Sequence, residues 1–166
     1  MDAAYLHLTV NHFPIVLTTV GALAALLAMV SGRRVVWLYA CATLTLAGLS
    51  APLAFFTGRE AEETVEHSWF VTREAIDAHE EAGEWALWVL LAMGVVSLYA
   101  WMRRLRAPDV VRLPRWLQAL VVLLALVGAA TVGRTAWLGG YVVHKAAALQ
   151  GTAPPGSATT PEPAPR

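Results

Sequence analysis

Charged residues are scarce in this chain of 166 residues: they make up 14% of the sequence, whereas hydrophobic residues make up 57%. A soluble domain typically has about 25% charged and 45–50% apolar residues, so the composition argues against a water-soluble globule. Twelve basic and twelve acidic residues cancel, and no excess of positive charge indicates a nucleic-acid partner. The length suits one domain.

Cysteine is almost absent as well. Cys41 is the only one, which excludes an internal disulfide and the Cys-x-x-Cys-His attachment of c-type haem; in its apolar run it is expected to pack as a small hydrophobe. The chain also lacks a basic stretch before its first apolar run, so no cleavable signal peptide is expected. Nothing resembles a phosphate-binding loop, a dinucleotide fingerprint or a nucleophile with its base, and an independent enzyme is therefore the least favoured class.

Long apolar runs are what the chain has in abundance. A bilayer core of about 30 Å is crossed by about 20 helical residues, and in hydrocarbon the backbone amides of each run must be paired within a helix. We expect an all-α fold, an integral membrane four-helix transmembrane bundle within residues 1–150, with spans over about 13–30, 35–57, 85–102 and 116–138. The second span is expected to close at Gly58, followed by a loop over 58–84. The proline-rich residues 151–166 predict a disordered tail.

The arginines predict the orientation of these spans. Seven of the twelve basic residues fall in the two connections at one end: Arg33, Arg34, Arg103, Arg104, Arg106, Arg112 and Arg115. Because positively charged loops stay in the cytoplasm, the pattern predicts a multi-pass protein of the bacterial inner membrane. Both termini, the 58–84 loop and the tail would then be periplasmic.

All five histidines fall at the opposite end from these arginines: His7, His12, His67, His79 and His144. At 1.5 Å of helical rise per residue, His12 would lie about 31 Å above Arg33 and His79 about 36 Å above Arg103, near the outer headgroup boundary. Arg134 is the one charge inside a span. It is either the charged partner of a site or a side chain that extends to the interface.

Several motifs resemble those of a large, uncharacterised family of bacterial four-helix membrane proteins, known as a domain of unknown function. Residues 7–15, His-Leu-Thr-Val-Asn-His-Phe-Pro-Ile, resemble its His-x4-His-Phe-Pro-Ile opening motif. Thr57-Gly58 resembles the motif that ends its second helix, His79 the histidine that opens its third, and the run from Leu138 to His144 its Gly-Gly motif near the end of the fourth. The resemblance covers residues 5–148 and implies the same bundle. Some relatives are joined to cytochrome-type modules, which favours redox work.

The leading hypothesis for the histidine cluster is a non-covalent b-type haem in an electron-transfer protein, because imidazole is a common axial ligand and helix bundles build cofactor sites from facing helices. His12 and His79 are the first candidate ligands, His7 and His144 follow, and Arg134 is the candidate charge partner.

Two alternatives stay open. The same four histidines, His12, His79, His7 and His144, would also suit a divalent metal ion such as zinc, copper or iron. The chain would otherwise be an accessory subunit of a larger respiratory or photosynthetic membrane complex, with histidines that cap helices. Its expected partners are the lipid bilayer and, in addition, other membrane subunits or a periplasmic cytochrome.

Overall fold

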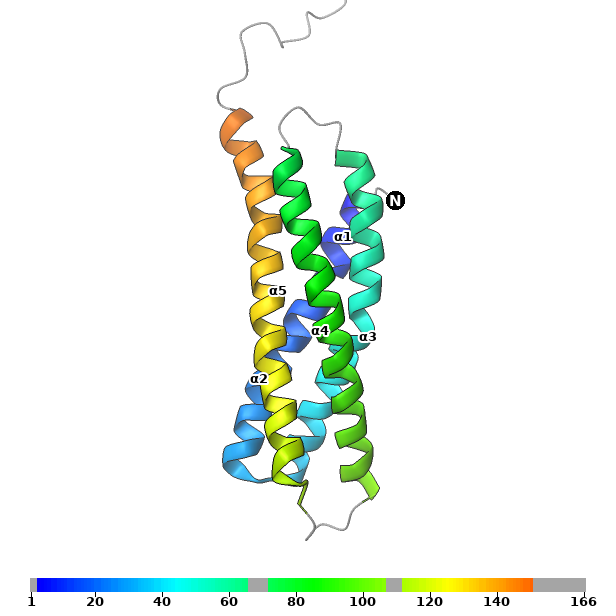
Figure 1. Ribbon diagram of the computed structural model, residues 1–166, viewed down its shortest axis with the longest axis vertical. Coiled ribbons are helices and arrows are strands. Elements are labelled where there is room, and N and C mark those ends of the chain that lie inside the picture. The colour runs from blue at the N-terminus through cyan, green and yellow to red at the C-terminus, as the bar shows by residue number, and fades with distance from the viewer. Residues whose placement is uncertain (1–2, 66–71, 107–111, 151–166) are drawn as a thin grey trace, which may run out of the picture.

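The computed structural model is all-α in the residues that it describes, which are 3–65, 72–106 and 112–150 of the backbone and 3–62, 72–106 and 112–142 of the side chains. Its helices are α1 (Ala3–Val10), α2 (His12–Ser31), α3 (Arg34–Val65), α4 (Arg73–Arg106) and α5 (Arg115–Gln150) (Figure 1). Four stretches are long and apolar enough to cross a membrane: Ala3–Ser31, Arg34–Glu62, Arg73–Arg106 and Arg115–Val142. The prediction of a four-helix transmembrane bundle is confirmed.

The helices extend farther than the expected spans. α3 does not end at Gly58 but continues to Val65, and α4 begins at Arg73, so most of the loop expected over 58–84 is helical. Arg, Glu and Ala are good helix formers, and an ion pair at 3.5 Å between Arg73 and Asp77, four residues apart, supports the first turn of α4. The tail predicted to be disordered, 151–166, lies outside the described residues.

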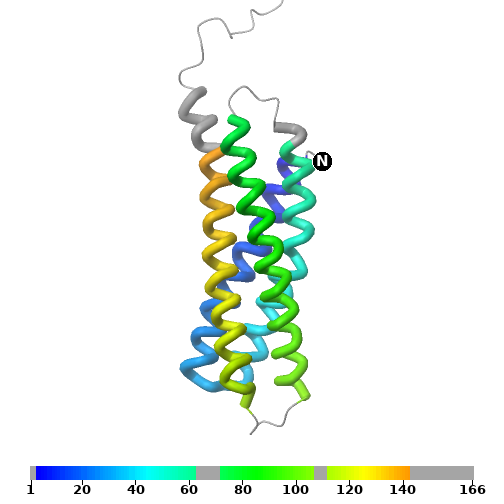
Figure 2. The backbone as a smooth tube through the Cα atoms, viewed as in Figure 1, coloured from blue at the N-terminus to red at the C-terminus, as the bar shows by residue number. Residues whose placement is uncertain are grey.

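A proline separates the first span into two helices. Pro14 lies in the first turn of α2, where a missing N–H costs nothing, and Asn11 stands between α1 and α2. In Figure 2 the blue tube of α1 and α2 runs obliquely behind α4. As a result α1 packs against α3, whereas α2 packs against both α3 and α5.

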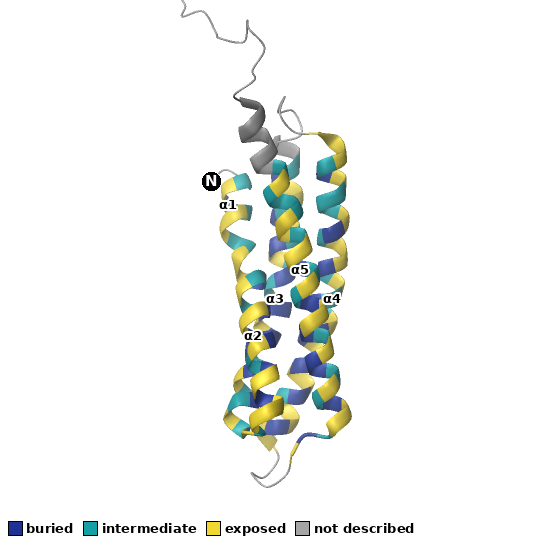
Figure 3. Ribbon diagram, turned by 90° about the vertical axis from the view of Figure 1, so that its left-hand side faces the viewer, coloured by how far each residue is buried: buried dark blue, intermediate teal, exposed yellow. Residues whose placement is uncertain are grey.

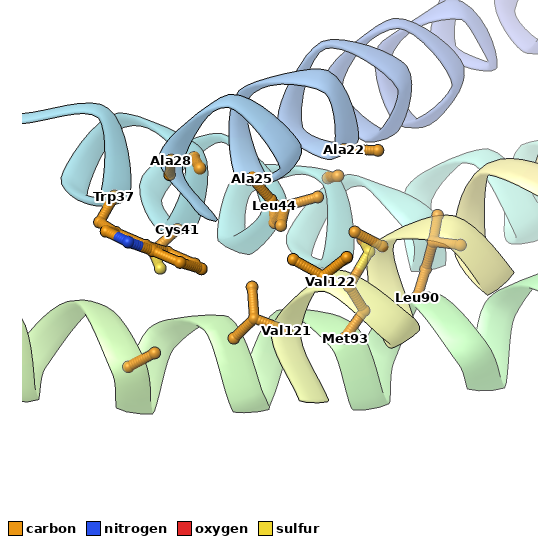
Figure 4. Close-up of a cluster of buried hydrophobic side chains, with 14 of the residues drawn as sticks. Ala22, Ala25, Ala28, Trp37, Cys41, Leu44, Leu90, Met93, Val121 and Val122 are labelled. Carbon is orange, nitrogen blue, oxygen red and sulfur yellow. The ribbon is translucent and has the colours of Figure 1, made fainter. Parts of the chain in front are cut away.

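The four long helices form a closed ring in the order α2, α3, α4, α5, with contacts between each neighbouring pair and between α5 and α2. Small residues of α2 let the backbones approach one another around Leu44, Leu90, Met93 and Val121 (Figure 4). Exposed residues run along the length of the bundle on its outward faces (Figure 3), and many of them are large and apolar. In a bilayer these side chains face lipid.

The bundle contains an internal repeat of two helical hairpins, which the residue types conceal. The buried residues of α2 are Pro14, Thr18, Gly21, Ala22, Ala25 and Ala28. His7 and His79 are 72 residues apart. When 72 is added to the number of each buried position of α2, the result is a buried position of α4: Ala86, Leu90, Met93, Gly94, Ser97 and Ala100.

The second helices of the two hairpins correspond in the same way. α3 begins at Arg34 and α5 at Arg115, 81 residues later. The same offset of 81 residues relates five buried positions of α3 to five of α5. They pair as Ala40 with Val121, Cys41 with Val122, Leu44 with Ala125, Ala47 with Gly128, and Ala51 with Val132. The hairpins α2–α3 and α4–α5 therefore share one pattern of buried positions.

Candidate histidine site

His7 of α1 is held against α3. Its Nδ1 lies 3.1 Å from the carbonyl oxygen of Ala54 and 3.4 Å from the hydroxyl of Thr57. A backbone carbonyl can only accept a hydrogen bond, so Nδ1 carries the proton and Nε2 of the neutral ring keeps its lone pair. The ring lies over Gly58, where an added Cβ would be 3.0 Å from Cε1 of His7.

His79 of α4 is held against α5 in the same manner. Its Nδ1 donates to the carbonyl oxygen of Thr135 at 3.1 Å, and a Cβ added at Gly139 would lie 2.9 Å from Cε1 of the ring. The hydroxyl of Thr135 donates to the carbonyl of Ala82 at 3.0 Å, which ties α5 back to α4. This neutral ring also keeps Nε2 unprotonated.

The two arrangements are equivalent under the internal repeat. Ala54 and Thr135 are related by the 81-residue offset, and so are Gly58 and Gly139. In each case the glycine follows the acceptor by four residues, so within an α-helix its N–H bonds to the same carbonyl that accepts the histidine. In each hairpin, one carbonyl and one glycine of the second helix thus form the surface that the histidine of the first helix contacts. We call this surface the glycine bed.

The two rings meet at the end of the bundle opposite the arginines. Their centroids are 6.5 Å apart and their planes are inclined by 76°. Since α1 continues into α2, the histidines come from the two helices that face each other across the ring of helices. Beside them an ion pair at 4.0 Å joins Arg59 of α3 to Glu80 of α4; both side chains are largely exposed, so the pair stabilises the bundle little.

Of the other candidate residues, two are exposed and two lie outside the described residues. His12 is exposed, and its Nδ1 bonds to the carbonyl of Leu8 within its own turn at 2.6 Å. Arg134 is also exposed, and it makes no ion pair with the residues that the structure describes. The side chain of His144 and all of His67 lie outside the described residues.

Sequence reasoning treated Gly58 as the end of the second span and Gly139 as part of a Gly-Gly motif that allows close approach to the fourth helix, and it missed their place beneath the two histidines. A signal was present: each glycine lies 24 residues after the arginine that begins its helix, Arg34 or Arg115. Thr135 and Ala54 were missed because they act through backbone carbonyls, which carry no mark in the sequence.

The comparison with known families agrees with this architecture. The family described as "Predicted membrane protein (DUF2231)" matches residues 4–149, nearly all of the helical part of the chain. The chain belongs to the DUF2231 family. This confirms the resemblance drawn from the opening motif. Both histidines of the pair and both glycine beds fall within the part of this DUF2231 protein that the family matches. No curated protein and no solved structure matches it.

Proposed function

We propose that this DUF2231 protein binds a b-type haem between His7 and His79 and serves in electron transfer at one face of the membrane. The observation that carries the proposal is the paired geometry. One imidazole comes from α1 and one from α4, their ring centroids lie 6.5 Å apart in an edge-to-face arrangement, and both have Nδ1 committed to a backbone carbonyl. Histidines that bind a metal almost always donate their other ring N–H in this way.

The distance between the rings suits one metal centre. Imidazole nitrogen binds a metal at about 2.0–2.1 Å, which puts the ring centroids of two opposed ligands on the order of 6 Å apart. The observed separation is 6.5 Å. Both rings could therefore hold the same metal centre.

The number of ligands favours haem over a bare ion. A structural zinc site takes four protein ligands and a catalytic site three, whereas a haem iron with two axial ligands takes only two from the protein. Among the side chains that the structure describes, no three His, Cys, Asp or Glu residues come together as a metal group. The pair therefore matches the donor set of a haem.

The residues of this chain would each have a definite task. Nε2 of His7 and of His79 would hold the haem iron, and the carbonyls of Ala54 and Thr135 would fix the orientation of the rings. Arg59, at the same end of the bundle, would attract the carboxylates of the macrocycle. When bound, the haem supplies a one-electron couple that the protein tunes through these ligands and their burial.

The location follows from the charge distribution. Seven arginines lie at one end of the bundle and the histidine pair at the other, and by the positive-inside rule this supports a location of the pair on the periplasmic side of a bacterial inner membrane. A haem there would exchange electrons with a periplasmic cytochrome or with a neighbouring membrane subunit.

Absorption spectra of the protein purified in mild detergent from haem-replete cells test the proposal. The wild type should show a Soret band that sharpens and shifts on reduction. His79→Ala and His7→Ala should each lose the bound haem while keeping the helical circular dichroism of the bundle. His12→Ala is the matched control, since this exposed histidine is five residues from His7, and it should keep the spectrum. A colourless wild type, or full haem content in His79→Ala, would refute the assignment.

A further inference from the structure

The arginine-rich end of the bundle carries a pocket that the proposed haem site does not use. It has a volume of about 330 Å³, opens outward from α4, and is lined by Tyr99, Met102, Arg103 and Arg106. These residues recur at intervals of three and four, so they form one stripe on the helix surface. All four are exposed, on a face that meets lipid when the bundle is in a bilayer.

The cationic part of the pocket is held in place. Nη1 of Arg103 donates to the hydroxyl of Tyr99 at 3.1 Å, and its guanidinium carbon lies 5.8 Å from the centre of the Tyr99 ring. The nearby C-terminal carbonyl of Leu105 is already bound by Nη2 of Arg34 at 3.2 Å. Arg103 and Arg106 are therefore not needed to cap this carbonyl. Because their guanidinium groups line the pocket, they can bind an anion there.

The apolar part of the stripe continues toward the middle of the span. Val95 is 67% exposed and Trp88 62% exposed along the same face of α4. A ligand that fits both parts has an anionic head at the level of the two arginines and a hydrocarbon tail along the helix.

We propose that this stripe binds an anionic phospholipid, with its phosphate between Arg103 and Arg106 and an acyl chain along Met102, Tyr99 and Val95. Guanidinium groups bind phosphate through short, charge-assisted hydrogen bonds, and basic pockets beside transmembrane helices bind lipid head groups. No carboxylate lines the pocket among the described residues, so charge complementarity favours an anion.

The internal repeat shows that the feature is particular to one hairpin. The positions equivalent to Tyr99, Met102 and Arg103 are Leu27, Val30 and Ser31, so only the counterpart of Arg106, Arg34 at the start of α3, is an arginine. A site of this kind is therefore expected beside α4 and not beside α2.

Native mass spectrometry of the full chain in detergent, titrated with dioleoyl phosphatidylglycerol or dioleoyl phosphatidylcholine, tests the proposal. The wild type should bind the anionic lipid about tenfold more tightly than the zwitterionic one. The double variant Arg103→Gln/Arg106→Gln should lose this preference. The control Arg33→Gln/Arg115→Gln removes two positive charges from the same end but outside the pocket, and it should keep the preference.

Three results would overturn the inference. One is a wild type without preference for the anionic lipid, and another is an equal loss in the control, which would show attraction to the overall charge of this end. The third is displacement of the lipid by millimolar inorganic phosphate, which would identify a site for free anions. All three readouts are independent of haem content.

Discussion

At the scale of single residues, the site depends on what two positions lack. Gly58 and Gly139 have no Cβ, and each has an imidazole ring where that atom would be, at 3.0 and 2.9 Å from Cε1 respectively. The rings can therefore come close to the neighbouring helix and reach its carbonyls. A methyl group on either helix would push the ring away from its hydrogen-bond acceptor.

Substitution of Gly139 tests this arrangement without removing a histidine. In Gly139→Ala the new methyl group would contact His79, break its bond to Thr135 and turn Nε2 out of position. We expect the bound haem to fall to less than about one tenth of the wild-type amount, since loss of such supporting contacts costs about 10–100-fold in metal affinity. The ratio of Soret to protein absorbance measures it.

The same helix provides the control. A Cβ added at Gly133 would meet nothing within 4 Å, so Gly133→Ala should keep the haem and stabilise α5 slightly, because Ala is the better helix former by about 1 kcal/mol. Equal haem content in the two alanine variants would show that the glycine bed does not position His79.

At the scale of helices, α3 and α4 cross at closest approach at Gly48 and Gly94. A Cβ at Gly48 would lie 2.7 Å from the carbonyl oxygen of Leu90 and 2.8 Å from Cα of Gly94. These are backbone atoms, which cannot turn aside as a side chain does. Pro52, which has no N–H to give to the carbonyl of Gly48, lies one turn farther along the same helix.

Gly48→Ala should therefore force α3 and α4 apart. Overpacking of this kind costs about 1–3 kcal/mol, and we expect a lower midpoint of thermal unfolding in detergent, followed by circular dichroism at 222 nm. Gly133→Ala again serves as the control. An unchanged midpoint for Gly48→Ala would mean that this crossing does not hold the hairpins together.

The existence and number of the helices could be predicted from the sequence, but their ends could not. Apolar runs between arginines mark the spans because hydrocarbon admits few alternatives. Beyond the bilayer that constraint ends, and Gly58, a common helix terminator, proved to lie inside α3. There the helix-forming residues that follow, Arg59 to Glu62, outweigh the glycine.

At the scale of the whole molecule, the histidine pair is a consequence of the internal repeat. Sequence reasoning found that the histidines share one end of the bundle but could not tell which two meet. That depends on the packing of α1 against α3 and on the burial pattern shared by α2 and α4. The repeat is concealed because equivalent positions carry different residues, such as Thr18 and Leu90.

The orientation of the bundle decides which compartment the pair serves, and single cysteines can report it. Cys41 is fully buried, so Cys41→Ala gives a background in which Glu81→Cys marks the histidine end and Ser31→Cys the arginine end; both native residues are exposed. If the positive-inside rule holds, a membrane-impermeant maleimide added to intact spheroplasts should label position 81 at once and position 31 only after the membrane is permeabilised. Mass shifts on gels measure the labelling. The reverse order would put the histidine pair on the cytoplasmic side, where a periplasmic electron donor could not reach it.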